Sequence, residues 1–265
     1  MSWRKYLLVP RLAVAGLRHR PDPDEAWQSY WSGVGSTGPG GEVLWDGAGD
    51  QELRWWRDTT RRYFDRTLPV LDVGCGNGRL SRLVAADFPW VLGIDVSPAA
   101  VDLARRETRG RDRVAFRQAD ITADGVGADL AAELGPANVI IRGVLHVLDD
   151  DQQQRAVEAL ATVLGDRGTV ALLETNWPGD PLGYLEHLGG RSGRLPPAVD
   201  RLIKVGVPRP SSLGPSQVSD LFPPSGWEVV ASGPVHIAVV GGSGADGRAI
   251  PGFHAVLRRS RHVPS

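Results

Sequence analysis

Cysteine, methionine and lysine are nearly absent from this sequence. Its 265 residues include one cysteine, Cys75, one methionine and two lysines. A lone cysteine excludes an internal disulfide bond, which favours a reducing cytoplasm as the location. Arginine therefore supplies almost all of the basic charge. Together with abundant alanine, glycine and proline, this composition is typical of a bacterial genome rich in G and C.

An excess of one charge and long apolar runs are also missing. The formal net charge is −1 at pH 7 and the basic residues are scattered, which argues against a nucleic-acid partner. The apolar stretch at residues 7–17 is broken by Pro10 and Arg11 and is too short to span a bilayer. We expect a helix packed on its own domain there, without stable membrane insertion. A helix lying on a membrane surface is the alternative.

Strand-like and helix-like segments alternate from residue 69 onward. Strand patterns occupy residues 69–73, 91–94, 114–116, 138–141, 169–173, 227–230 and 253–257. Helix patterns occupy residues 78–87, 98–107, 150–164 and 216–222. This alternation predicts an α/β fold with a doubly wound, mostly parallel, seven-stranded sheet. Its ligand should lie at the carboxyl ends of the first strands.

Two regions fall outside this alternation. Residues 1–68 carry six of the nine tryptophans, and residues 176–214 are rich in proline and glycine with little periodicity. Long connections often close over a ligand, so we expect an N-terminal helical lid at 1–68. A lid-like insert is expected at 176–214, within a ligand-binding domain spanning 69–265. Residues 241–247 are expected to form a glycine-rich hairpin tip.

The most informative segment is the glycine turn that follows the first strand. Gly74, Gly76 and Gly78 stand on alternate positions, and such glycines let a ligand press against bare backbone. A dinucleotide fingerprint would need its third glycine where Arg79 stands, and the sequence has no P-loop pattern. A pyrophosphate ligand is therefore disfavoured.

The stretch LDVGCGNGRLSRLVA around this turn resembles the first motif of class I S-adenosylmethionine-dependent methyltransferases. The resemblance implies S-adenosylmethionine as cofactor, with its methionine part over Gly74 and Gly76 and its amino group near Asp72. A carboxylate beside the turn also suits an ammonium and a sulfonium better than a pyrophosphate. Asp95 ends the second strand, 21 residues after Gly74, where an acidic side chain can hold both ribose hydroxyls.

Further positions extend the resemblance along the chain. Val96, next to Asp95, would pack on the adenine face. Asp120 resembles the acidic residue that accepts from the adenine amino group, with the amide of Ile121 beside it. Arg142 follows the fourth strand, where the family lines the cofactor pocket beneath the transferred methyl group. A single aspartate at a strand end usually caps a turn, but three acids in register with a glycine turn favour a cofactor site.

Upstream, Trp27 and Trp31 stand four residues apart and would share one face of a helix. This pattern is similar to the N-terminal tryptophan helix of the thiopurine methyltransferases, although the glycine turn here differs from theirs. The similarity implies that both indoles contact the cofactor, whose sulfonium gains cation–π stabilisation beside an aromatic face. Ordinary core packing is the alternative.

Three residues are candidates for the acceptor side of the site. His146, four residues past Arg142, is the candidate catalytic base, the alternative being a histidine that binds backbone. Glu174, at the end of the fifth strand, and Trp177 are expected to contact the substrate. We expect no metal site.

These observations predict a methyltransferase that uses S-adenosylmethionine to modify a small molecule at oxygen, nitrogen, sulfur or carbon. Tryptophans near the expected entrance favour an apolar or aromatic acceptor, as in specialised metabolism. Two alternatives stay open, a cofactor-binding cyclase that transfers no methyl group and a non-catalytic binding partner. The acceptor and the oligomeric state do not follow from the sequence.

Overall fold

The protein is described from a computed structural model, which covers residues 21–47, 50–190, 194–240 and 249–260. The predicted helix at 7–17 and the predicted hairpin tip at 241–247 lie outside these described residues. Within the described ranges, no helix combines the length and the apolar character needed to cross a bilayer.

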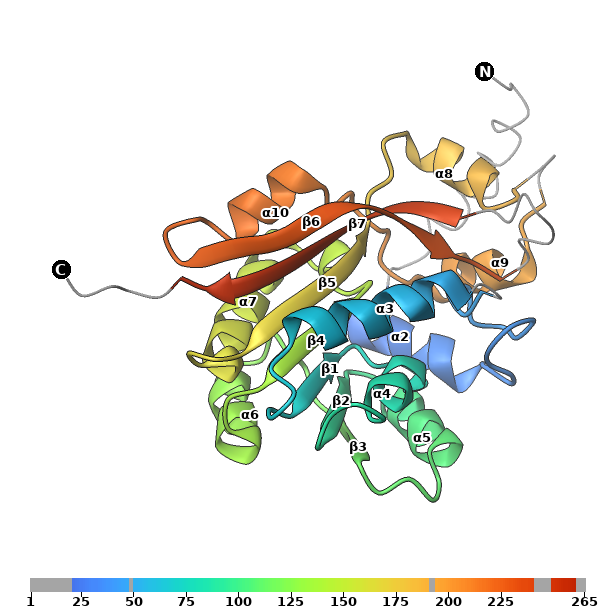
Figure 1. Ribbon diagram of the computed structural model, residues 1–265. Coiled ribbons are helices and arrows are strands. Elements are labelled where there is room, and N and C mark those ends of the chain that lie inside the picture. The colour runs from blue at the N-terminus through green and yellow to red at the C-terminus, as the bar shows by residue number, and fades with distance from the viewer. Residues whose placement is uncertain (1–20, 48–49, 191–193, 241–248, 261–265) are drawn as a thin grey trace.

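A seven-stranded sheet forms the centre of the fold, as predicted (Figure 1). The strands are β1 (Val70–Val73), β2 (Val91–Asp95), β3 (Val114–Gln118), β4 (Asn138–Arg142), β5 (Thr169–Thr175), β6 (Trp227–Ala238) and β7 (Ala249–Arg259). Their order is β3-β2-β1-β4-β5-β7-β6. The first five strands pair in parallel, whereas β7 is antiparallel to both β5 and β6. Because the order reverses between β1 and β4, a ligand should lie where these two strands end.

Helices cover both faces of the sheet, which makes the fold doubly wound (Figure 1). One face is covered by α3 (Asp50–Tyr63), α4 (Arg79–Val84) and α5 (Pro98–Glu107). The other face is covered by α6 (Val126–Leu134), α7 (Asp150–Leu164) and α10 (Pro215–Leu221). Trp56 is fully buried in the core of the first face, and Leu160 and Phe222 in that of the second.

Three further helices lie around the ligand end of the sheet. These are α2 (Pro23–Ser32), α8 (Pro181–His187) and α9 (Pro197–Val205). Each begins with a proline, whose fixed φ suits the first helical position. Here α2 packs against α5 and α9, so parts of the predicted lid and the predicted insert meet. In contrast, α3 packs on the sheet although it also belongs to residues 1–68.

The last two strands are longer than the sequence pattern predicts. Gly233 and Pro234 interrupt the pattern after residue 230, yet β6 continues to Ala238. This strand is at the edge of the sheet, where a proline need not remove a ladder hydrogen bond. The longer β6 and β7 carry Ile237 and Ile250 to the ligand end of the molecule.

Candidate active site

Two adjoining cavities open at the carboxyl ends of the parallel strands. The larger has a volume of about 980 Å³ and the smaller about 60 Å³, and Trp45, Gly74 and Arg142 border both. The larger volume is at the upper end for a ligand pocket, which leaves room for two small molecules. Predicted site residues lining the larger cavity are Trp27, Trp31, Gly74, Asp95, Val96, Asp120, Ile121, Arg142, His146 and Trp177. Those lining the smaller cavity are Asp72, Gly74, Gly76 and Arg142.

The glycine turn between β1 and α4 leaves no space for side chains. Gly74 and Gly76 have φ angles of 66° and 53°, in the left-handed region that favours glycine. A Cβ atom on Gly74 would lie 2.4 Å from the Val144 side chain, and one on Gly76 would lie 2.8 Å from the Trp31 ring. Val144 and Trp31 therefore pack directly on the backbone of the turn, and Gly74 borders both cavities.

Asp72 brings a buried carboxylate to the smaller cavity. It belongs to β1, is 2% exposed and accepts a hydrogen bond from Ser81 Oγ at 2.5 Å. Burial raises the pKa of Asp72 to about 7 despite that hydrogen bond, and the charge of Asp95 adds to the rise. A cation in the smaller cavity would favour the ionised carboxylate, so the site suits the ammonium group of an amino acid.

Asp95 ends β2 and binds both the glycine turn after β1 and the loop after β2. Its carboxylate accepts hydrogen bonds from the backbone N–H groups of Gly76 and Ser97, both at 2.9 Å. Burial raises the pKa of Asp95 to about 6, although both donors oppose the rise. Since the side chain also lines the larger cavity, its remaining acceptor positions can serve the two hydroxyls of a ribose.

A second pair of acids lies farther along the larger cavity. Asp120 follows β3 and accepts a hydrogen bond from Thr122 N–H at 2.7 Å. Asp24, from α2, also lines the cavity, and burial together with the charge of Asp120 raises its pKa. Val96 and Ile121 provide apolar walls beside them. Asp24 was not predicted as a site residue, because an acid in the first turn of a helix is common without any ligand.

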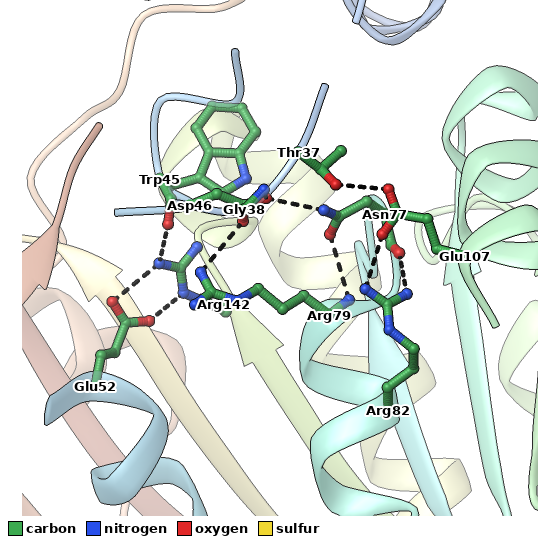
Figure 2. A network of polar contacts seen from close by, with 10 residues as sticks. All are labelled: Thr37, Gly38, Trp45, Asp46, Glu52, Asn77, Arg79, Arg82, Glu107 and Arg142. Carbon is green, nitrogen blue, oxygen red and sulfur yellow. Dashed lines mark hydrogen bonds and ion pairs between the residues drawn. The ribbon is translucent and has the colours of Figure 1, made fainter. Parts of the chain in front are cut away.

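Arg142, at the end of β4, joins the sheet to Trp45 and Glu52, which precede β1 in the chain (Figure 2). Its guanidinium pairs with both oxygens of Glu52 and donates to the carbonyl oxygen of Trp45 at 2.9 Å. Burial opposes the charge of Arg142, but Glu52 outweighs this effect and the pKa of Arg142 lies above its usual value. Glu52 gave no sequence signal, because an acid in the first turn of a helix usually faces solvent.

Asp46 extends these contacts to the glycine turn. Its carboxylate accepts from Gly38 N–H at 3.0 Å and from Asn77 Nδ2 at 2.8 Å, and lies 3.8 Å from Arg79 (Figure 2). The N-terminal segment is thereby held against the turn. The smaller cavity has acidic and basic side chains on its walls, which matches the two charges of an amino acid.

Four aromatic rings pack together near Asp46 and the glycine turn. Trp45 stacks on Tyr30 with ring centroids 5.4 Å apart and meets Trp27 and Trp31 edge to face at 6.0 and 6.1 Å. The three indoles line the larger cavity, while Tyr30 is buried behind them. The predicted tryptophan pair is therefore both packed in a cluster and accessible from the cavity.

Glu174 does not contact the cavity, contrary to the prediction that it reaches the substrate. Its side chain is fully buried, and its carboxylate accepts from the N–H groups of Val144 and Leu145 at 3.1 and 3.0 Å. It also forms a hydrogen bond with the ring of His146. A buried carboxylate needs such donors, and the loop after β4 supplies them.

Much of the remaining lining of the larger cavity is apolar, although Asp180, Arg209 and Gln152 also border it. Its walls come from α8, α9 and the ends of β6 and β7, through Tyr184, Leu185, Leu188, Val199, Leu202, Ile203, Ile237 and Ile250. Trp177 packs against Tyr184 and His187, with ring centroids 5.5 and 4.9 Å apart. In the described part of the chain, no three or more His, Cys, Asp and Glu side chains gather as a metal site requires.

The doubly wound sheet and the glycine turn with its acids are typical of nucleotide-binding α/β domains. Residues 70–168 match the protein family described as a methyltransferase domain. The methyltransferase tpcM of Aspergillus fumigatus is 32% identical over 111 residues, which cover 42% of this chain and 32% of that protein. The chain thus spans about a third of the length of the curated relatives it matches.

Solved structures extend the similarity over most of the chain. The S-adenosylmethionine-dependent methyltransferase of Anabaena variabilis has 25% identity and a TM-score of 0.79, covering 91% of this chain and 98% of that one. The N-methyltransferase NodS of Bradyrhizobium japonicum, in complex with S-adenosylhomocysteine, has 15% identity and a TM-score of 0.53. The alignment covers 89% of this chain and 100% of NodS.

Residues 70–168 therefore form a methyltransferase domain, and the chain resembles a solved S-adenosylmethionine-dependent methyltransferase over most of its length, which implies S-adenosylmethionine as the cofactor. The residues present fit this molecule. The carboxylates of Asp72 and Asp95 border the two cavities beside the glycine turn, where they suit an ammonium group and a ribose.

Proposed function

We propose that this protein transfers the methyl group of S-adenosylmethionine to a small, apolar or aromatic molecule. One observation carries the proposal. The same cavity is lined by the acids Asp95 and Asp120 and by apolar side chains of α8 and α9. A cofactor and an apolar acceptor would therefore meet in one continuous space.

Each end of the cofactor has a matching group in the chain. When bound, S-adenosylmethionine supplies an electrophilic methyl group on a sulfonium. Asp72 would hold the amino group, Asp95 the ribose hydroxyls and Asp120 the adenine amino group. Trp31 and Trp45 would present aromatic faces to the sulfonium, which stabilises a cation.

The acceptor would lie against the apolar wall, with Trp177 beside it. Apolar walls exclude water and limit the orientations of a bound molecule, which brings two reactants into line. A concave, largely apolar cavity suits a small molecule rather than a protein surface or a nucleic acid. This chemistry is typical of specialised metabolism.

Calorimetry and mass spectrometry test the proposal together. Titration with S-adenosylmethionine should give a micromolar dissociation constant. Incubation with the cofactor and a panel of hydroxylated, aminated and thiol-bearing aromatic compounds should give a product heavier by one methylene group. No binding at millimolar cofactor would overturn the cofactor site. A rearranged product of unchanged mass would instead indicate a cyclase and contradict methyl transfer.

A further inference from the structure

We propose that the methyl acceptor has an apolar body with one carboxylate group, and that Arg209 binds this carboxylate at the rim of the larger cavity. The inference rests on the proposed methyl transfer and specifies the class of acceptor. Its basis is one positive charge that lines the cavity without a partner in the described part of the chain.

The two arginines that line the larger cavity differ in how their charges are balanced. Arg142 pairs with both carboxylate oxygens of Glu52, so its charge is neutralised within the protein. Arg209, in contrast, forms no hydrogen bond or ion pair with any other described residue. No lysine among the described residues lines this cavity. Arg209 is therefore the cation that an anionic ligand in the cavity would find available.

Three further polar side chains of this lining already have partners within the chain, namely Gln152, Asp180 and Ser212. Gln152 accepts from the N–H of Asp149, which caps α7, at 3.1 Å. The Asp180 carboxylate accepts from a backbone N–H of α8 at 2.9 Å. The hydroxyl of Ser212 donates to the carbonyl oxygen of Trp177. Because these groups are engaged, a polar group on the acceptor would find its strongest free partner in the guanidinium.

The backbone around Arg209 is held in place from both sides. Pro208 and Pro210 flank it and line the cavity with it. Each proline fixes its own φ and favours an extended backbone in the residue before it. Next to them, the N–H and Oγ of Ser211 donate to the carbonyl oxygen of His146 at 2.7 and 2.9 Å. Less ordering is therefore needed when a ligand binds here, which favours affinity.

Arg209 is exposed although it lines the cavity, which places it at the rim. Apolar side chains such as Leu185 of α8 and Ile203 of α9 line the same space. A molecule with both kinds of surface can bury its apolar body and keep its anionic group partly hydrated at the rim. This arrangement avoids the cost of burying a carboxylate and still gains a charge-assisted hydrogen bond.

The chemistry of a single guanidinium favours a carboxylate over other charged groups. One unpaired positive charge matches one negative charge, whereas a phosphate dianion would keep part of its charge unbalanced. The two oxygens of a carboxylate also lie in one plane and fit two parallel N–H groups of arginine. A cationic amine at the same place would be repelled.

The first test measures binding without turnover. Calorimetry on the protein saturated with S-adenosylhomocysteine compares aromatic carboxylates of one to three rings with their neutral amides. The wild type should bind the best carboxylate about 10-fold more tightly than its amide, and salt should reduce this preference. Arg209→Gln should abolish the preference, and Arg209→Lys should retain part of it. Arg106→Gln, at an exposed position of α5, is the matched control and should behave as the wild type.

Two results of this experiment would overturn the inference. The first is equal affinity of the wild type for carboxylates and amides, or no binding of any carboxylate. The second is a preference for carboxylates that survives in Arg209→Gln, because another group would then bind the anion.

The second test measures methyl transfer to hydroxylated and aminated members of the same panel. Arg209→Gln should lower kcat/KM for carboxylates about 10-fold, mainly by raising KM, and should leave the values for amides unchanged. Its affinity for S-adenosylmethionine should equal that of the wild type. Equally efficient transfer to amides and carboxylates would overturn the inference and leave the proposed function intact. Carboxylate-selective binding without methyl transfer to any compound would contradict the proposed function alone.

Discussion

The two ends of the larger cavity are built in different ways. At the cofactor end, charged side chains lie where strands end: Asp95 is the last residue of β2, and Asp120 follows β3 by two residues. At the acceptor end, apolar side chains come from α8, α9, β6 and β7, which are far apart in the chain. Polar groups at set positions specify one ligand, whereas an apolar wall selects mainly by size and shape. One end therefore identifies its ligand by chemistry, and the other only restricts it.

The chain before β1 borders both the larger and the smaller cavity. Through Trp45 it contributes a wall to both cavities, and through Glu52 and Asp46 it pairs with Arg142 and the glycine turn (Figure 2). A variant at the cofactor end should weaken cofactor binding alone, and a variant at the acceptor end should weaken acceptor binding alone. If one variant weakens both, the two binding events are coupled.

The largest effect is expected from Asp95→Ala at the cofactor end. Loss of two charge-assisted hydrogen bonds to the ribose, each worth about 1.5–3 kcal/mol, should weaken S-adenosylmethionine binding about 1,000-fold or more. Calorimetry measures this loss. Asp102→Ala, at an exposed position of α5, is the matched control and should bind normally. Unchanged binding by Asp95→Ala would mean that the cofactor does not lie at this end.

A smaller effect is expected from Asp72→Asn, which should change how the free energy of unfolding depends on pH. Burial raises the pKa of Asp72 from 3.8 to about 7, so between these values the native state binds more protons than the unfolded state. The stability that this group contributes is therefore lost as the pH rises. From pH 5 to pH 8 the cofactor-free wild type should lose about 2 kcal/mol of unfolding free energy from this group.

Denaturant unfolding at the two pH values checks this expectation. Asp72→Asn should lack that loss and should bind the cofactor more weakly, because an amide cannot neutralise an ammonium. Asp102→Asn should keep the wild-type pH dependence. If Asp72→Asn shows the same loss as the wild type, Asp72 is not the group that titrates.

The smallest effect is expected from Ile203→Ala at the acceptor end. Removing part of one apolar contact costs about 1–3 kcal/mol, so kcat/KM for the acceptor should fall about 10-fold. The affinity for S-adenosylmethionine should not change. Val229→Ala, at an exposed position of β6, serves as the control in the same assays. An equal loss of cofactor affinity in Ile203→Ala would show that the two ends are not independent.

The sequence predicted the sheet and the positions of the strand-end residues, but not every direction in which their side chains point. Asp95 and Glu174 both stand at a strand end, yet one lines the cavity and the other is enclosed by the loop after β4. Glu52 and Trp45 were not predicted as site residues because their partners, Arg142 and Tyr30, are distant or buried. The helices α8 and α9 were not predicted because they lie within the proline- and glycine-rich stretch at 176–214, which was interpreted as a lid-like insert.

By itself the sequence determined the α/β sheet, the bare glycine turn and the row of acids, and hence the cofactor. These features are local, because each depends on the strand and the turn immediately beside it. Only the tertiary structure decided that Glu174 pairs with His146, that Glu52 pairs with Arg142 and that α8 and α9 supply apolar walls to the larger cavity. Those contacts join residues that are remote in the chain, and their energies depend on burial that folding alone creates.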